Sequence, residues 1–343
     1  MNGSKMPVIQ AKRLAYLARR LMLNVYLLEG EYEGSPLRLL VADDGSTLSY
    51  ILSLAFPEGA AVSSLGRISA FKAPELAGSD ADIIVVGANQ LLVRRYEQRG
   101  FHIVPKYVRL FLSMSDHPDV MISRLKRSAK ENVRRNLRRM TAAGLGYELQ
   151  TAPPWFDLFY HEMYRPYIGL KFGESADIYS YRYLKREFSK GGVLVINING
   201  EPVAGTLVYM EGSMMRIPFS GVMRGREDLV RQGVVTALYY YGMLLGHSWG
   251  CSVINFGHSR PFLSDGVLKY KLRWGMTVED DDDGRSSFAI MAPGWTVQAA
   301  KFISSHRFFY RQNGGIELLA DPCLAESGNL PESTKSIGQV ESG

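Results

Sequence analysis

The sequence predicts a mixed α/β protein made of two domains and a short tail. The chain has 343 residues, more than the roughly 250–300 at which a single hydrophobic core stops growing. Hydrophobic residues make up 46% of it and charged residues 22%, the balance of an ordinary soluble globular protein. Helix-like and strand-like apolar patterns alternate along its length. We therefore expect domains at residues 1–112 and 113–320, followed by a polar, flexible tail at 321–343.

The first domain is expected to be a mixed α/β unit. Leucines at helical spacing predict a helix at Lys12–Leu23. Strands at Val25–Leu28, Leu37–Ala42 and Thr47–Leu54 follow, separated by Gly, Asp and Pro. The remaining elements are a buried strand, a helix and an extended segment, at Asp82–Gly87, Ala88–Arg99 and Phe101–Leu112. This part of the chain contains no motif that indicates chemistry.

A strongly basic helix opens the second domain and is predicted to run from Asp119 to Ala143. Between Ser123 and Arg139 the chain has eight Lys or Arg residues and one Glu. Like charges one helical turn apart repel each other by roughly 0.2–0.5 kcal/mol per pair, which an anion would relieve. The anion would be a nucleic-acid phosphate, a phosphate of a nucleotide- or lipid-linked substrate, or an anionic membrane surface, and a solvated face is the alternative. The candidate anion-binding residues are Lys126, Lys130, Arg134 and Arg138.

Two helices and a three-stranded antiparallel unit come next. The helices are expected at Trp155–Tyr167, ending near Pro166, and at Tyr179–Phe188. Asn199-Gly200 is a two-residue turn of the kind that matches the twist of a β-hairpin. The three strands are predicted at Val193–Asn199, Pro202–Met210 and Met214–Met223.

The stretch from Arg231 to Gly275 is where we expect the chemistry. A helix begins near Gly233, and a buried strand, Ser252–Phe256, follows it. A strand after a helix is most easily a parallel neighbour in the sheet, so the polar loop behind it lies at the edge where α/β sheets present ligands. The last predicted elements are a strand, an acidic turn, a strand and a helix, at Met276–Val278, Glu279–Asp283, Ser287–Met291 and Thr296–Phe309.

Composition argues against several classes of protein. The N-terminal basic residues are interspersed with apolar ones, unlike a signal peptide, and no apolar run approaches the roughly 18–20 residues that a transmembrane helix needs. Cys251 and Cys323 are the only cysteines and lack the spacing of metal ligands. The acidic turn lacks the oxygen pattern of a calcium loop. We expect a cytoplasmic protein that requires no metal.

The ordered set of motifs resembles the acyltransferase fold of the GNAT superfamily, and more narrowly its FemAB-like branch. That branch includes peptidoglycan-bridge aminoacyltransferases and acetyltransferase-like bacterial relatives. The resemblance covers Pro105 to about Gly275, and the first hundred residues only by domain order. It implies two tandem copies of the fold, the first degenerate. The matching pieces are NGEPVAG, the glycine-started helix, FG, YKLRWG and an arginine-rich segment, at Asn199–Gly205, Gly233–Leu245, Phe256-Gly257, Tyr270–Gly275 and Arg134–Gly144.

The resemblance also implies a reaction. An acyl group, acetyl or longer, would pass from a thioester carrier such as acyl-CoA to a small-molecule or carrier-linked amine. FemAB-like enzymes can use aminoacyl-tRNA, so transfer of an aminoacyl group onto a cell-envelope or peptide precursor is the alternative. A third possibility, from another class, is a non-catalytic binding protein for nucleic acid or anionic lipid.

Three residues are the catalytic candidates. Lys271 matches the lysine of the family's aromatic-Lys-x-x-aromatic-Gly segment and would hold a donor phosphate or stabilise an oxyanion; the alternative is a solvated strand lysine. His258 would take a proton from the attacking amine, or else be an ordinary loop histidine. Arg260 would bind a carboxylate or phosphate, or lie on the surface. One tyrosine of Tyr239–Tyr241 is expected near the site, without a choice among them.

The start of the glycine-started helix is the candidate cofactor site, at Arg231, Gln232 and Gly233. Users of acetyl-CoA in the superfamily usually show Arg/Gln-x-x-Gly-x-Gly/Ala there, where backbone N–H groups hold the pyrophosphate. This chain has Val230 at the first position and Val235 at the last. A valine at the last position adds bulk where the backbone would approach phosphate. The donor phosphates are therefore expected to depend on the basic helix as well as on Gly233.

Overall fold

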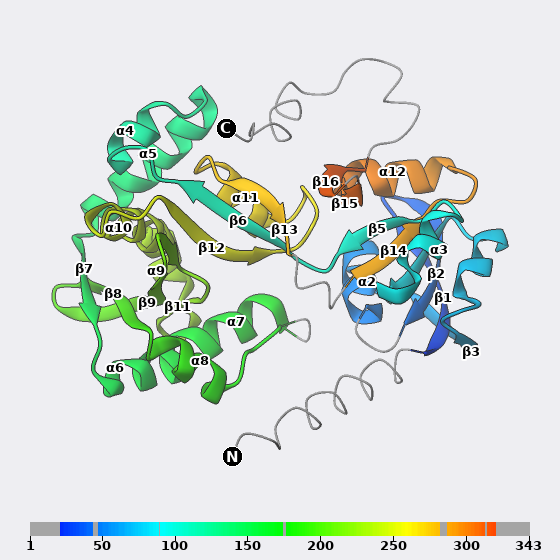
Figure 1. The fold of residues 1–343 in the computed structure, drawn as a ribbon, viewed down its shortest axis with the longest axis horizontal. Coiled ribbons are helices and arrows are strands. Elements are labelled where there is room, and N and C mark those ends of the chain that lie inside the picture. Colours follow the sequence, from blue (N-terminus) through cyan, green and yellow to red (C-terminus); the bar gives the residue numbers. More distant parts are fainter. Residues whose placement is uncertain are drawn as a thin grey trace. The chain divides into compact units, whose positions relative to one another are not determined.

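The computed structural model describes residues 21–43, 47–88, 90–173, 176–281, 287–312 and 314–319. The chain forms two compact units, each with its own sheet (Figure 1). Unit 1 comprises Met1–Val108, Arg260–Asp265 and Asp280–Gly343, and unit 2 comprises Arg109–Ser259 and Gly266–Glu279. The predicted mixed α/β fold is confirmed, but two stretches assigned to the second domain belong to unit 1. The predicted tail, and most of the predicted helix at Lys12–Leu23, lie outside the described residues.

Unit 1 is built on a six-stranded sheet with the strand order β3-β1-β2-β4-β14-β5. Strands β2 and β4 are parallel, and the other neighbours are antiparallel. The strands are β1 (Met22–Tyr32), β2 (Ser35–Asp43), β3 (Ala61–Ser69), β4 (Ile83–Ala88), β5 (His102–Pro105) and β14 (Ser287–Met291). With them lie α2 (Leu48–Ala55), η1 (Ala73–Gly78), η2 (Gln90–Leu92), α3 (Val93–Glu97), α12 (Val297–His306) and the hairpin β15–β16 (Phe309–Gln312, Gly315–Leu318).

One predicted strand of unit 1 is a helix. The segment expected to be extended at Thr47–Leu54 contains α2, which buries Tyr50 and Ile51. The buried carboxylate of Asp43 accepts hydrogen bonds from the backbone N–H groups of Thr47, at 2.6 Å, and Leu48, at 2.8 Å. The first N–H groups of a helix have no hydrogen-bond acceptor within the helix, so Asp43 supplies the missing acceptor. The apolar run at Thr47–Leu54 alone did not reveal that the segment is helical.

Unit 2 is built on a longer mixed sheet with the order β13-β6-β12-β10-β9-β8-β7, and β11 also pairs with β9. The predicted hairpin is confirmed as β8–β9, with Asn199 at φ 53° and Gly200 at φ 85° in its turn. The strands are β6 (Val108–Ser113), β7 (Leu145–Gln150), β8 (Gly191–Ile198), β9 (Glu201–Glu211), β10 (Met214–Arg216), β11 (Ser220–Val222), β12 (Val253–Ser259) and β13 (Thr277–Asp280).

Two predicted helices of unit 2 differ from the structure. The basic helix is broken at Lys126, whose extended ψ of 146° separates α4 from α5. The helix expected to end near Pro166 continues to Phe172, because a π-helical turn precedes α7 and the proline falls in its first turn, where no N–H donor is needed. The helices are α4 (Pro118–Ser123), α5 (Arg127–Ala142), α6 (Pro153–Leu158), the π-helix η3 (Phe159–Tyr164), α7 (Arg165–Phe172), α8 (Tyr181–Phe188), η5 (Met223–Gly225), α9 (Glu227–Gln232), α10 (Val234–Ser248) and α11 (Gly266–Leu272).

Candidate functional site

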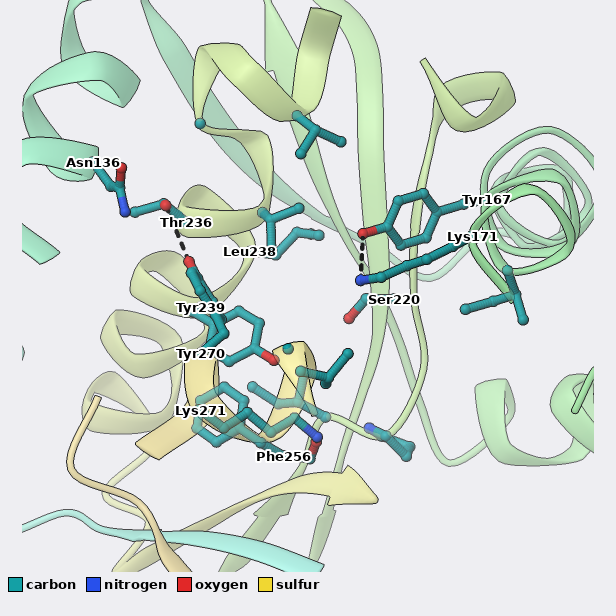
Figure 2. Close-up of a pocket in the computed structure, with 18 of the residues that line it drawn as sticks. Asn136, Tyr167, Lys171, Ser220, Thr236, Leu238, Tyr239, Phe256, Tyr270 and Lys271 are labelled. Atoms are coloured by element: carbon teal, nitrogen blue, oxygen red, sulfur yellow. Dashed lines mark hydrogen bonds between the residues drawn. The ribbon is translucent and has the colours of Figure 1, made fainter. Parts of the chain in front are cut away.

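A pocket of about 420 Å³ opens in unit 2 where two parallel strands part (Figure 2). Strands β10 and β12 pair as far as Arg216 and Asn255. The predicted third strand is then interrupted at Pro218, which has no N–H to donate to a sheet, and β11 continues along β9. The pocket lies between these diverging strands, with Ile217, Pro218 and Ser220 on one side and Phe256 and His258 on the other.

An aromatic cluster from α10, α11 and β12 forms part of the wall. Tyr239 stacks on Phe256, with ring centroids 4.9 Å apart and an interplanar angle of 13°, and meets Tyr270 at a right angle. Burial raises the pKa of Tyr239 well above its ordinary value, so this phenol keeps its proton at neutral pH. The Tyr270 hydroxyl lies 3.0 Å from Thr236 Oγ1 (Figure 2), and burial raises the pKa of Tyr270 to about 12.

The structure selects Tyr239 from the three adjacent tyrosines as the one that lines the pocket. The Tyr240 hydroxyl donates to Asp119 Oδ1 at 2.9 Å. The Tyr241 hydroxyl donates to the carbonyl oxygen of Leu145 at 2.5 Å. Both of these tyrosines therefore connect α10 to its neighbours.

Lys271 lines the pocket from α11 and is only 4% exposed. Its Nζ donates to the carbonyl oxygens of Phe256 and His258, both at 2.8 Å. These carbonyls flank Gly257, whose φ of 71° is a left-handed conformation that glycine adopts without strain. A Cβ at Gly257 would also lie 3.0 Å from the carbonyl oxygen of Pro218. Lys271 is thus a buried helix lysine that fixes the end of β12, and the alternative of a solvated strand lysine is wrong.

The other two catalytic candidates lie in different units. His258 is exposed, lines the pocket and belongs to β12, which extends three residues beyond its predicted end at Phe256. Arg260 belongs to unit 1, where its guanidinium carbon lies 5.2 Å from the centroid of the Tyr50 ring. It is not among the residues that line the pocket. The structure brings His258 and Lys271 together at this pocket, without Arg260.

The predicted glycine-started helix is confirmed as α10. Gly233, at φ 99°, ends α9 and begins α10. A Cβ there would lie 3.3 Å from the backbone nitrogen of Met140 on α5, so the glycine is also needed for close helix packing. Arg231 and Gly233 line the pocket, as does Val235, whereas Gln232 is exposed and does not. Arg231 is paired with Glu227 at 3.3 Å, in a salt bridge that is largely exposed.

The charge on the pocket lining is all of one sign. Four cationic side chains line it, from four different helices: Arg139, Lys171, Arg231 and Lys271. Within the described part of the chain, no Asp or Glu does so. Sequence reasoning missed Arg139 and Lys171. Arg139 was among the eight basic residues, and Lys171 follows Tyr167 at the i,i+4 spacing, where its Nζ donates to the tyrosine hydroxyl at 3.2 Å.

The four candidate anion-binding residues of the basic helix do not line this pocket. Lys126 is the N-terminal cap residue of α5, and Lys130 lies one turn further on. Arg134 and Arg138 are exposed and border a separate surface hollow, together with Leu137, Thr141 and Ala142. Helix α5 therefore presents Arg139 to the pocket and other arginines to a neighbouring surface.

Two further observations concern metals and membranes. Among the described residues, no group of three or more His, Cys, Asp or Glu side chains is placed to bind a metal ion. In the same part of the chain, no helix combines the length and the apolar character required to cross a bilayer.

Comparison with known proteins finds similarity in solved structures. No protein-family model and no curated protein matches the chain. FemX is similar over 77% of this chain and 83% of its own, with 12% identity and a TM-score of 0.40. L-PGS from Bacillus licheniformis is similar over 88% and 95%, with 11% identity and a TM-score of 0.37. A GCN5-related N-acetyltransferase from Sphaerobacter thermophilus is similar over 74% and 71%, with 12% identity and a TM-score of 0.35.

Proposed function

We propose that unit 2 is an acyltransferase that moves an acyl group from an anionic carrier to an amine. The observation that carries the proposal is the pocket that opens where β10 and β12 part, whose lining includes four cationic side chains and, in the described residues, no carboxylate. Such a site favours a ligand with negative charge. It also favours the neutral form of a bound amine, because nearby cations lower the pKa of an ammonium group, and only the neutral amine is a nucleophile.

The donor would place its phosphates at the rim formed by α5, α9 and α10. Arg139 and Arg231 are on this rim, and the first N–H groups of α10 follow Gly233. Arginine and helix N-termini are both suited to phosphate. An acyl-CoA thioester is the preferred donor. An aminoacyl-tRNA is the alternative, since α5, which forms part of this rim, also carries exposed arginines that would contact the backbone of a nucleic acid.

The reaction is an ordinary acyl transfer. The amine nitrogen attacks the carbonyl carbon, the carbonyl electrons move to oxygen, and the resulting oxyanion collapses with loss of the carrier thiolate, or of the ribose oxygen from tRNA. The amine loses a proton to His258 or to solvent. The neutral phenol of Tyr239 is suited to donate a hydrogen bond to the oxyanion or a proton to the leaving group. Lys271 acts as a positioning residue that holds the end of β12.

Native mass spectrometry of the full chain with acetyl-CoA, palmitoyl-CoA and a charged tRNA tests the donor. One of these is expected to bind saturably, and Arg231→Gln should weaken coenzyme A binding by about tenfold, the loss of one charge-assisted hydrogen bond. Arg226→Gln is the matched control, since Arg226 is paired with Asp228 and does not line the pocket. If no donor binds to the folded wild type, the proposal is wrong.

A non-catalytic role in binding nucleic acid or anionic lipid is the second candidate. It is favoured by the exposed Arg134 and Arg138, which lie outside the pocket lining. The two candidates differ in turnover. Acyl transfer that disappears in a pocket variant contradicts a purely binding role, whereas polyanion binding without turnover on any donor supports it.

A further inference from the structure

Two separate walls of the pocket carry positive charge, and only one of them adjoins the proposed donor rim. Arg139 and Arg231 belong to the seam where Gly233 packs against α5. Lys171 belongs to α7, which packs on β11. In Figure 2, Lys171 and Tyr167 lie across the cavity from Asn136 and Thr236. Donor phosphates held at the rim by Arg139 and Arg231 therefore leave the charge of Lys171 for another anion.

The α7 wall has an ordered set of polar groups. Lys171 Nζ donates to the Tyr167 hydroxyl at 3.2 Å. Because the phenol oxygen already accepts this hydrogen bond, its own hydrogen is directed away from Lys171 and is available to a ligand. The Ser220 hydroxyl donates to Thr206 Oγ1 at 2.9 Å, and Thr206 in turn donates to the carbonyl oxygen of Phe219 at 2.8 Å. This relay fixes the direction of the Ser220 hydrogen and leaves its oxygen as an acceptor. Figure 2 shows the Ser220 oxygen on the same side of the cavity as Lys171.

From this arrangement we infer that the acyl acceptor is an amine that also carries a carboxylate, as an amino acid does. The carboxylate binds Lys171 and Tyr167, which together offer one positive charge and two hydrogen-bond donor groups, an ammonium and a phenol. The amine donates to Ser220 Oγ and faces the donor carbonyl. A simple alkylamine has no group for the α7 wall, and its ammonium form is repelled by the cationic lining. The inference rests on the proposed acyltransferase function and specifies its acceptor.

Matched pairs of acceptors test it. Each of the twenty amino acids and its carboxamide is incubated with the full chain and the donor that binds, and acylated product is measured by mass spectrometry. At least one amino acid should react with a kcat/KM about tenfold or more above that of its amide, because the amide cannot form the charge-assisted hydrogen bond that the carboxylate makes with Lys171. Equal or faster acylation of the amides, preferential acylation of phosphoethanolamine, or no product from an amino acid while the donor binds would overturn the inference.

Variants of Lys171 test whether the α7 wall binds the carboxylate of the acceptor. In Lys171→Met the preference for acid over amide should fall to about one, through a higher KM for the acid, and Lys171→Arg should restore most of it. The control is Lys185→Met, because Lys185 makes the same i,i+4 contact with the Tyr181 hydroxyl, at 2.9 Å, but does not line the pocket. An unchanged preference in Lys171→Met contradicts the inference. Donor binding, measured separately without acceptor, tests the underlying function, so the two can fail independently.

Discussion

The side chain of Lys271 is hydrogen-bonded to the backbone of His258, with 2.8 Å between the ammonium nitrogen and the carbonyl oxygen. The same ammonium holds the carbonyl of Phe256 at an equal distance. A charged group thus supplies donors to two carbonyls at the point where β12 leaves its neighbour β10. The shape of the pocket wall and the stability of the unit depend on the same pair of hydrogen bonds.

Replacement of Lys271 by methionine should reduce both stability and activity. Two carbonyls would be left without their partner, at roughly 1–3 kcal/mol for each group in that state, so we expect a decrease of about 2–6 kcal/mol in the free energy of unfolding. Chemical denaturation followed by circular dichroism measures it. Lys269→Met, on the exposed side of the same helix, should change stability by less than about 0.5 kcal/mol. A stable, fully active Lys271→Met protein would show that these hydrogen bonds are dispensable.

Gly257→Ala should destabilise the protein more than Gly250→Ala. Both glycines have similar positive φ, 71° and 68°, so both substitutions cost roughly 1–2 kcal/mol for the left-handed backbone. Nothing lies within 4 Å of a Cβ at Gly250, whereas at Gly257 it would lie 3.0 Å from the Pro218 carbonyl oxygen. Overpacking should add at least about 1 kcal/mol at Gly257. Equal unfolding midpoints for the two variants would argue against close packing of β12 on Pro218.

Tyr239→Phe should lower kcat by about a hundredfold and leave the affinity for the donor nearly unchanged. The reason is the removal of a hydroxyl that keeps its proton, because burial holds the pKa of Tyr239 well above its ordinary value. The ring stacking on Phe256 is retained, so the fold should persist. Tyr241→Phe is the control, since that hydroxyl donates to Leu145. Steady-state kinetics give the answer, and a Tyr239→Phe enzyme with wild-type kcat excludes the phenol from the reaction.

The double variant Arg134→Gln/Arg138→Gln should distinguish the two donors. Neither residue lines the pocket, so coenzyme A binding is expected to remain within about twofold. Binding of tRNA, if it follows the exposed face of α5, should weaken, and the slope of log K against log salt should decrease by about 2, one for each phosphate that an arginine no longer neutralises. Titrations at several salt concentrations measure the slope. An unchanged slope places any nucleic acid elsewhere.

His306 should make the stability of unit 1 sensitive to acid. Burial lowers its pKa to about 4, from 6.5 in an unfolded chain. The unfolded state therefore binds more protons between these values, and stability is complete above pH 6.5 and decreases as the pH falls towards 4, by at most about 3 kcal/mol. Urea unfolding at pH 7.0, 5.5 and 4.5 measures this decrease. It should be smaller in His306→Gln, which removes the titrating group, than in the control His247→Gln, which removes an exposed one.

Local chemistry in the sequence was sufficient to predict much of unit 2. The Asn199-Gly200 turn fixed a hairpin, and Gly233 marked the start of α10, because both depend on the conformational freedom of single residues. His258, Arg260 and Lys271 were predicted to line one edge; His258 and Lys271 do line one pocket, and Arg260 does not. Their roles in catalysis remain predictions.

What the sequence did not reveal depends on distant partners. Nothing local to Arg260 indicates that it packs on Tyr50 in unit 1. Lys171 was not singled out, because the wall opposite it comes from helices on either side of Gly233. Thr47–Leu54 has an apolar pattern that suits a strand, whereas in the structure the Asp43 carboxylate accepts hydrogen bonds from the first N–H groups of a helix there. In each of these three cases, the structure depends on a residue or element that lies outside the local sequence pattern.

The placement of β14 has a consequence for the order in which the protein is made. This strand pairs with both β4 and β5 and so lies between them in the sheet of unit 1, yet it follows the whole of unit 2 in the chain. During translation, every strand of unit 2 is therefore synthesised before β14. Until β14 emerges, β4 and β5 lack the strand that pairs with both of them. During synthesis, unit 2 can complete its fold first, while a nascent unit 1 retains open strand edges of the kind that attract chaperones.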